Sequence, residues 1–303
     1  MNRRDFSKLV GGGFTLSTFS GLANNNSQPA NNTFTLKYAP HFGMFKNHAG
    51  DNLIDQLHYM HEMGFRALED NEMMERPIEM QQKIGETLGK LGMEMGVFVV
   101  KFNGFFDKSH MTTGKKEWTD LFLKACNQAV ETAKRVNAKW MTVVPGNFTR
   151  ELPMGIQTGN VIENLKRAAE IFEPHHLAMV LEPLSDNPDL FLRHADQSYA
   201  ICKAVGGTAC KTLFDIYHMQ RNDGNLIKMM EWCWDEIAYI QIGDNPGRKE
   251  PGTGEINYGK IFDFLRKKNY NGVLGMEHGN FFPGKEGEQK LIDAYVKSDK
   301  AYL

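Results

Sequence analysis

The sequence lacks several features that would assign it to a particular class of protein. Its four cysteines include no CxxC pair, so buried free thiols are a better interpretation than a disulfide framework. The formal net charge is −2, and without a basic excess neither nucleic acid nor an anionic membrane is expected as a partner. No GxGxxG motif follows the first apolar run, where a dinucleotide-binding fold would need it. Hydrophobic residues make up 41% of the chain, which is ample for a large folded core.

The first 33 residues differ in composition from the rest of the chain. Arg3 and Arg4, followed by Asp5, Phe6 and Lys8, resemble a twin-arginine signal. The next stretch is too short and too polar to span a bilayer, and its glycines each cost a helix about 1 kcal/mol. We therefore expect residues 1–33 to be a signal peptide and a disordered spacer, and the protein to be exported to the periplasm. An ordinary amphipathic first helix is the alternative.

From residue 34 onward, short apolar segments alternate with amphipathic ones. Apolar residues have helical spacing in segments such as 52–64, 159–176 and 258–270. Eight strand–helix units in this length predict an α/β fold, a single-domain (β/α)8 TIM barrel over residues 34–303, with a doubly wound sheet as the second choice. The eight segments with the character of buried strands are 35–43, 65–70, 94–101, 139–146, 177–184, 210–218, 237–244 and 272–279.

The last four predicted strands each end on a polar residue. Alternation along the strands places Glu182, Asp215, Gln241 and Glu277 on the face that points into the barrel. Because active sites of such barrels lie at the C-terminal ends of the strands, these four side chains are expected to converge. Three close carboxylates repel one another unless a cation lies among them. We therefore predict that the four residues bind one divalent metal ion, Mg²⁺ or Mn²⁺.

The segments around these residues resemble a known family. They are LEPL with Glu182, FDIYHMQ with Asp215 and His218, YIQIGDNPGRKEPGTGEINY with Gln241 and Arg248, and GMEHG with Glu277. Over roughly the whole chain after residue 34, they resemble the xylose-isomerase-like TIM-barrel superfamily, and within it the hydroxypyruvate isomerase family most. Related ketose epimerases have a histidine at the place of Gln241. The signal segment is a second difference, since the familiar isomerases are cytoplasmic.

The resemblance implies a metal-dependent isomerase of a small α-hydroxy carbonyl compound, of the hydroxypyruvate/tartronate semialdehyde type. It would move a proton through an enediolate, with Glu182 and Glu277 as the catalytic acid–base pair. His218 would hold a substrate hydroxyl or oxyanion, and the planar guanidinium of Arg248 suits a substrate carboxylate. The alternatives are a satisfied loop histidine for His218 and an exposed loop charge for Arg248. The Gly- and Pro-rich loop around Arg248 is expected to be able to close over the site.

Four further residues are predicted near the substrate. His41 and Glu69, at the ends of the first two strands, are expected to line the substrate-binding pocket, and Asn103 and Phe105 to cover it.

Other functions fit the same fold. A ketose 3-epimerase or another sugar isomerase would use the same site, and Arg248 and Gln241 favour the keto-acid isomerase. An endonuclease-like phosphodiester enzyme would need several zinc ions with many histidine ligands, and few of the ten histidines lie at strand ends. A non-enzymatic exported sugar-binding barrel would tolerate loss of Glu182 or Glu277, and both are present. The expected partner is a small hydroxy-keto acid or sugar substrate. The sequence leaves open whether the chain forms a homo-oligomer.

Overall fold

The computed structural model describes residues 34–102 and 108–303, which lie within one compact unit. Each of the eight segments predicted as strands contains a strand, and the segment 94–101 contains two. The boundary at residue 34 stays a prediction, because residues 1–33 lie outside the described part of the chain. The strands are β1 (Lys37–Ala39), β2 (Ala67–Leu68), β3 (Glu94–Met95), β4 (Phe98–Val99), β5 (Trp140–Val143), β6 (Ala178–Leu181), β7 (Cys210–Asp215), β8 (Ile237–Gln241) and β9 (Val273–Gly275).

The strands form a closed parallel ring. Seven of them make one sheet in the order β1-β9-β8-β7-β6-β5-β4, and β2 pairs with β3. Backbone hydrogen bonds join the two sheets: the N–H of Glu69 donates to Pro40 O at 3.0 Å, and the N–H of Asp70 donates to Val97 O at 3.3 Å. Val97 lies between β3 and β4, so the ring runs from β1 through β2 to β4. The predicted TIM barrel is therefore confirmed.

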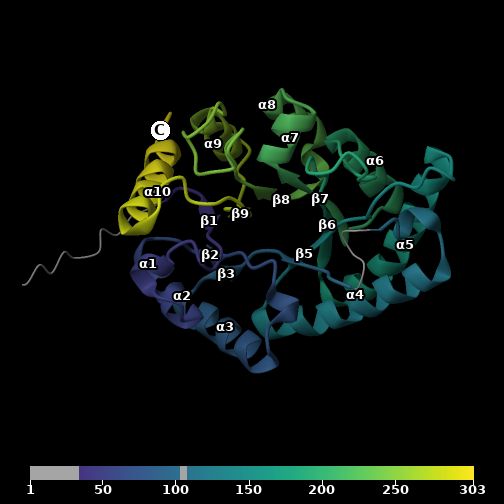
Figure 1. Cartoon of the computed structure of the whole chain (residues 1–303), viewed down its shortest axis with the longest axis horizontal. Coiled ribbons are helices and arrows are strands. Elements are labelled where there is room, and N and C mark those ends of the chain that lie inside the picture. Colours follow the sequence, from purple (N-terminus) through teal and green to yellow (C-terminus); the bar gives the residue numbers. More distant parts are fainter. Residues whose placement is uncertain (1–33, 103–107) are drawn as a thin grey trace, which may run out of the picture. The chain divides into compact units, whose positions relative to one another are not determined.

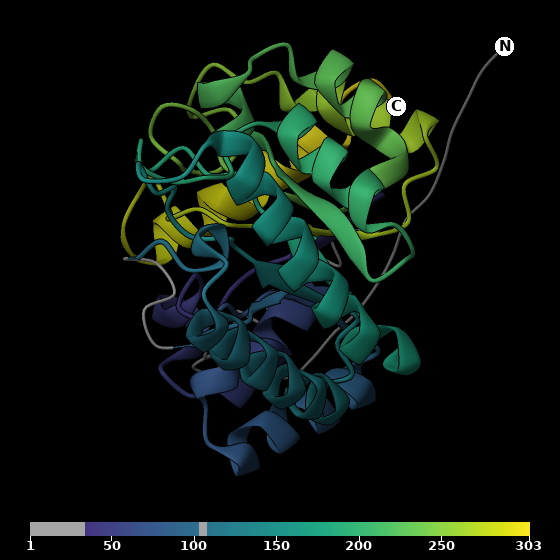
Figure 2. The same cartoon turned by 90° about the vertical axis from the view of Figure 1, so that its right-hand side faces the viewer.

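Helices surround the ring on its outside (Figure 1). In the turned view, the two long helices α4 and α5 run side by side across the outer surface (Figure 2). Both have their buried residues on one face, which is the amphipathic pattern expected of helices that pack on strands. The main helices are α2 (Leu53–Glu62), α3 (Ile78–Leu91), α4 (Lys116–Val136), α5 (Met154–Phe172), α6 (Ala195–Val205), α8 (Leu226–Cys233), α9 (Tyr258–Lys267) and α10 (Gly284–Asp299), with the shorter α1 (Lys46–Ala49) and α7 (Ile216–Asn222).

A helix begins inside one of the segments that the sequence predicts to be a strand. The segment 210–218 was expected to be extended throughout, with His218 where the following loop begins, but β7 ends at Asp215 and α7 begins at Ile216. The cause is the side chain of Asp215, which accepts a hydrogen bond from the backbone N–H of His218 at 3.0 Å and caps the helix. His218 therefore lies in the first turn of a helix, directly above the end of the strand.

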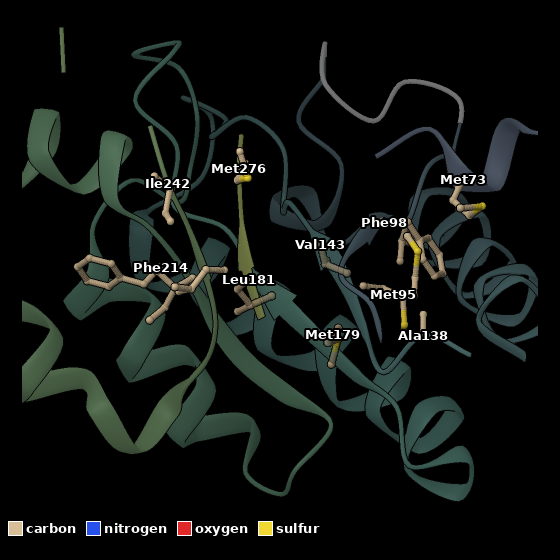
Figure 3. Close-up of a cluster of buried hydrophobic side chains, with 14 of the residues drawn as sticks. Met73, Met95, Phe98, Ala138, Val143, Met179, Leu181, Phe214, Ile242 and Met276 are labelled. Carbon is tan, nitrogen blue, oxygen red and sulfur yellow. The ribbon is translucent and has the colours of Figure 1, made fainter. Parts of the chain in front are cut away.

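The strands separate two hydrophobic clusters. Their outward-facing residues join the helices in the larger cluster, which includes Met179, Leu181, Phe214, Ile242 and Met276 (Figure 3). A smaller cluster fills the inside of the ring and takes residues from most of the strand segments: Ala39, Ala67, Val97, Val180, Leu213, Tyr239 and Val273. Side chains alternate between these clusters along each strand, so the inward face predicted from the sequence is the inward face observed.

All four cysteines are buried free thiols, as predicted. Cys126, Cys202 and Cys233 lie in helices, and Cys210 begins β7. In the described ranges, none of the helices is both long enough and apolar enough to cross a membrane.

Candidate active site

Polar side chains form the next layer above the small inner cluster. Val180 and Leu213 are followed two positions later by Glu182 and Asp215, and Tyr239 is followed in the same way by Gln241. Strand pairing places Asp215 beside Gln241 and Gln241 beside Gly275, two residues before Glu277. The barrel therefore brings the four predicted metal ligands to one end of its interior. Glu182, Asp215 and Gln241 are buried there, and Glu277 is partly exposed.

A cavity of about 180 Å³ opens onto this layer. It shares Asn71, Glu72 and Glu277 with a neighbouring cavity of about 280 Å³. The smaller cavity is lined by polar and charged residues that follow five different strands, namely Lys101, Glu182, Asp186, His218, Arg248 and Glu277. Asp215 and Gln241 have no exposed surface and lie beneath it.

The site has too few positive charges for its carboxylates. Ligand atoms of Glu182, Asp215 and His218 all lie within 4.8 Å of one another, which is close enough for them to share a metal ion. Nη2 of Arg248 donates to Asp215 Oδ2 at 3.0 Å and lies 3.5 Å from Glu277 Oε1. Arg248 is thus the main counter-charge for these acids.

Burial and mutual repulsion change the proton affinities of these acids. Burial raises the pKa of Glu182 well above its usual value, and the nearby Glu277 and Asp215 raise it further. Burial likewise raises the pKa of Glu277 to about 7, against the opposing effect of Arg248. Two carboxyl groups whose protons are held this tightly face one cavity, which is a common arrangement in acid–base catalysis.

His218 offers a hydrogen-bond donor to the cavity. Its Nδ1 accepts from the backbone N–H of Ser185 at 3.2 Å, and the Ser185 hydroxyl lies 2.8 Å from the same atom. Burial lowers the pKa of His218, which favours the neutral ring. Because a backbone N–H can only donate, the proton of that neutral ring is placed on Nε2. Nε2 has no hydrogen-bond partner among the residues that the structure describes, and it lies 3.8 to 3.9 Å from Glu182, Asp186 and Asp215.

Gln241 offers an acceptor in the same layer. Its Nε2 donates to Glu69 Oε1 at 2.9 Å, while its Oε1 is buried and has no hydrogen-bond partner within residues 34–102 and 108–303. In the same ranges, Glu277 Oε2 is a second buried oxygen without a partner. Two orphaned oxygens beside Glu182 and Asp215 fit a hard divalent cation, which prefers carboxylate and amide oxygen ligands. His218 fits this set less well, because its Nε2 carries the ring proton.

A folded loop brings Arg248 to the site. Asp244, just after β8, accepts hydrogen bonds from the backbone N–H groups of Gly252, Gly254 and Ile256 at 2.9, 2.9 and 3.1 Å. Arg248 has a left-handed backbone, with φ of 49°, and its guanidinium lies 5.0 Å from the centre of the Tyr217 ring. Nε of Arg248 also donates to the carbonyl of Glu277 at 3.1 Å. The loop predicted to be able to close over the site is thus held by hydrogen bonds within the loop and by the contacts of Arg248 with Glu277 and Asp215.

The remaining predicted pocket residues have varied surroundings. Glu69 and His41 line the larger cavity, and their strand ends pair with each other. Both ring nitrogens of His41 face backbone carbonyls, at 2.9 Å from Phe42 O and 3.0 Å from His278 O, so its contact with substrate stays a prediction. The predicted covering residues Asn103 and Phe105 lie outside the described residues.

Several residues in this region were missed by the sequence argument. Ser185 orients His218, and Asn71 donates to Glu277 Oε1 at 3.3 Å. Asp244 had one usable signal, because it is a carboxylate directly after a strand in a Gly-rich stretch.

The family assignment follows from a sequence match over most of the barrel. The pattern of the Xylose isomerase-like TIM barrel family matches residues 57–295. The chain belongs to this family. It is 39% identical to hydroxypyruvate isomerase of Escherichia coli over 120 residues, which cover 39% of this chain and 46% of that enzyme. It is 30% identical to 2-oxo-tetronate isomerase of Cupriavidus necator over 159 residues, 52% of this chain and 61% of the relative.

The alignments to these two relatives therefore span only about half of each enzyme's length. Among solved structures, a family 2 AP endonuclease from Brucella melitensis matches with a TM-score of 0.73. It is 21% identical, and the match covers 83% of this chain and 96% of the other. At that identity, the structural likeness shows a common fold.

Proposed function

We propose that the protein is a metal-dependent isomerase of small α-hydroxy keto acids, of the hydroxypyruvate and tartronate semialdehyde type. One observation carries the proposal: Glu182, Glu277 and the Nε2–H of His218 line a single small cavity above buried oxygen ligands. The relatives named hydroxypyruvate isomerase and 2-oxo-tetronate isomerase support the same class of substrate.

In this proposal the two glutamates exchange protons with adjacent carbons of the substrate. One carboxylate removes a proton from the carbon that bears the hydroxyl group, and the electron pair of that C–H bond forms an enediolate. The other delivers a proton to the former carbonyl carbon, and the hydroxyl proton moves to the neighbouring oxygen. Raised pKa values in Glu182 and Glu277 suit groups that must both take and return a proton. His218 donates to the substrate oxygen on which negative charge develops.

A divalent cation, Mg²⁺ or Mn²⁺, completes the proposed site. Oxygens of Glu182, Asp215, Gln241 and Glu277 would hold it, and once bound it would polarise the substrate carbonyl as a Lewis acid. Arg248 would then be available to orient the substrate carboxylate, because the cation replaces it as the counter-charge of Asp215.

The proposal is tested by assaying hydroxypyruvate and 2-oxo-tetronate beside a panel of ketoses, each with added Mg²⁺ or Mn²⁺. Turnover of a keto acid with deuterium uptake from D₂O is the expected result. Epimerisation of a ketose at its third carbon would favour the ketose 3-epimerase, and no turnover with either metal would reject the isomerase. Turnover without deuterium uptake calls for a substrate deuterated at the migrating position. Direct transfer of that label would replace the enediolate route with a hydride shift.

Export remains a separate proposal, supported by the twin-arginine pattern at Arg3 and Arg4. We expect the protein in the periplasmic fraction of a bacterium that has this export route, and a variant with both arginines changed to lysine in the cytoplasm. Equal distribution of the two proteins would contradict the proposal.

A further inference from the structure

We propose that Glu69 is a positioning residue, which holds the amide of Gln241 so that its oxygen faces the metal-binding position. The inference rests on the proposed metal site and adds a residue to it that does not itself bind the ion. It explains how a glutamine, whose amide has an oxygen and a nitrogen of nearly equal size, presents the oxygen reliably.

The contacts of Glu69 account for both of its oxygens. Oε1 accepts from Gln241 Nε2 at 2.9 Å, and Oε2 accepts from the Tyr239 hydroxyl at 2.8 Å. The side chain is buried, and no salt bridge to it occurs within residues 34–102 and 108–303. Both oxygens of Glu69 act as acceptors in these contacts, and an acceptor that faces Gln241 requires the NH₂ group of that amide rather than its oxygen. The oxygen of Gln241 then points the other way, where no described residue forms a hydrogen bond with it.

The barrel makes room for this arrangement at two glycines. A Cβ atom on Gly275 of β9 would collide with the carboxylate of Glu69, and one on Gly96 would collide with the hydroxyl of Tyr239. Neither residue has the positive φ that would itself require glycine. These two glycines therefore leave space for the side chains of Glu69 and Tyr239.

Burying a carboxyl group without a cationic partner is costly, and burial raises the pKa of Glu69 well above its usual value. The arrangement is understandable if the acceptor oxygens of this group have a use. If the oxygen of a glutamine at position 69 still accepts from Tyr239, its NH₂ group faces Gln241, so the Gln241 amide would turn over and present its own NH₂ group to the ion. Partners that orient a metal ligand in this way typically change metal affinity about 10–100-fold when they are replaced.

The test is a titration of the full-length, metal-free protein with Mn²⁺, followed by calorimetry or electron paramagnetic resonance. We expect Glu69→Gln to bind Mn²⁺ about 10–100-fold more weakly than the unchanged protein. The matched control is Glu288→Gln, another buried glutamate that receives several hydrogen bonds from Asn47 and His48, residues that line neither of the two cavities. The Glu288 variant should keep the original Mn²⁺ affinity among the molecules that fold.

A double exchange separates positioning from general support of the fold. In Glu69→Gln with Gln241→Glu, the amide at 69 accepts from Tyr239 and donates to the carboxylate at 241. An oxygen then faces the ion again, so we expect most of the lost affinity to return. If Glu69→Gln does not fold, the Mn²⁺ affinity of Tyr239→Phe tests the same inference. This variant removes the hydroxyl that donates to Glu69, and we expect it to lose less Mn²⁺ affinity than Glu69→Gln.

The outcomes are distinct. If Glu69→Gln binds Mn²⁺ as tightly as the unchanged protein, the inference is overturned and the proposed metal site remains intact. Unchanged Mn²⁺ affinity in Tyr239→Phe would have the same meaning. Failure of the double exchange to regain affinity would overturn positioning in favour of general support. A lack of Mn²⁺ binding in the unchanged protein would reject the metal site itself, and the inference with it.

Discussion

The two ends of the barrel treat buried carboxylates in opposite ways. At the N-terminal end, Glu236 is buried and is paired with Lys211 and Lys203, at 2.6 and 3.0 Å. Glu94 at the same end contacts Lys37 and lies 3.5 Å from Lys139. Burial alone would raise the pKa of Glu94, but the two lysines lower it overall.

At the C-terminal end, the acids outnumber the cations. Glu182 and Glu69 have no lysine or arginine within salt-bridge distance in the part of the chain that the structure describes, and the pKa of each is raised. Because the scaffold and strand geometry are common to both ends, this difference lies in the choice of side chains. The N-terminal end, where these acids are paired with lysines, stabilises the fold. The C-terminal end, where Glu182 and Glu69 lack such partners, is arranged at a cost to stability, as expected for a site that binds and reacts.

The largest expected difference between the two ends is in turnover. With the metal bound, Glu182→Gln and Glu277→Gln should each lower kcat by about 10²–10⁴-fold, because an amide can still ligate a metal but cannot accept a proton. Substrate affinity should change far less. The control at the other end is Glu236→Gln, for which kcat per folded molecule should match that of the unchanged protein. Retention of full kcat in either active-site variant would remove that glutamate from the acid–base pair.

Removal of the metal ion should change the activity and stability contributed by the C-terminal end of the barrel, where the proposed site lies, and not those contributed by the other end. We expect one divalent ion per chain by elemental analysis, and loss of both the ion and activity on chelation. At a free-ion concentration 100 times Kd, binding should stabilise the fold by about 2.7 kcal/mol. In the double variant Glu182→Gln, Asp215→Asn, this stabilisation should be absent. Full metal occupancy in that variant would show that the ion binds elsewhere.

The sequence predicts interactions between residues close together in the chain better than those between distant residues. Alternation along a strand is local, so it correctly placed Glu182, Asp215 and Gln241 on the inward face. The bond between Glu69 and Gln241 joins residues 172 positions apart, and the contact of Ser185 with His218 spans 33. No local pattern contains these pairs.

Competition between local patterns also limited the prediction. The segment 210–218 has an extended, apolar character, yet capping by the side chain of Asp215 starts a helix within it. The position of His218 therefore depended on one hydrogen bond that strand propensity does not describe.

Stability of the metal-free protein should change in opposite directions at the two ends. Glu236→Gln removes a buried partner of two lysines and should lower the free energy of unfolding by about 1–3 kcal/mol. Glu182→Gln removes a buried acid that must either ionise beside other acids or hold a proton, and should raise the free energy of unfolding by about 1 kcal/mol. Urea unfolding in the presence of a chelator measures both. A loss of stability in the Glu182 variant would mean that its carboxylate is compensated in a way the contacts do not reveal.

The stability of the metal-free protein should also depend on pH through an acid at the C-terminal end, Glu277. Burial raises the pKa of Glu277 from 4.5 to about 7 in the folded, metal-free protein, so between these values the folded state binds more protons than the unfolded state. The stabilisation from this group is complete below pH 4.5 and is lost as the pH rises through 7, with a slope of at most about 1.4 kcal/mol per pH unit. Urea unfolding of the metal-free protein and of its Glu277→Gln variant, from pH 5 to 8, measures this pH dependence.

The Glu277→Gln variant should lack the part of the pH dependence that comes from Glu277. Saturating Mg²⁺ should also remove it from the unchanged protein, because a carboxylate that ligates a cation has already lost its proton. Identical pH profiles for the two proteins would mean that Glu277 is ionised throughout this range, and that Arg248 alone compensates the acids of the C-terminal end.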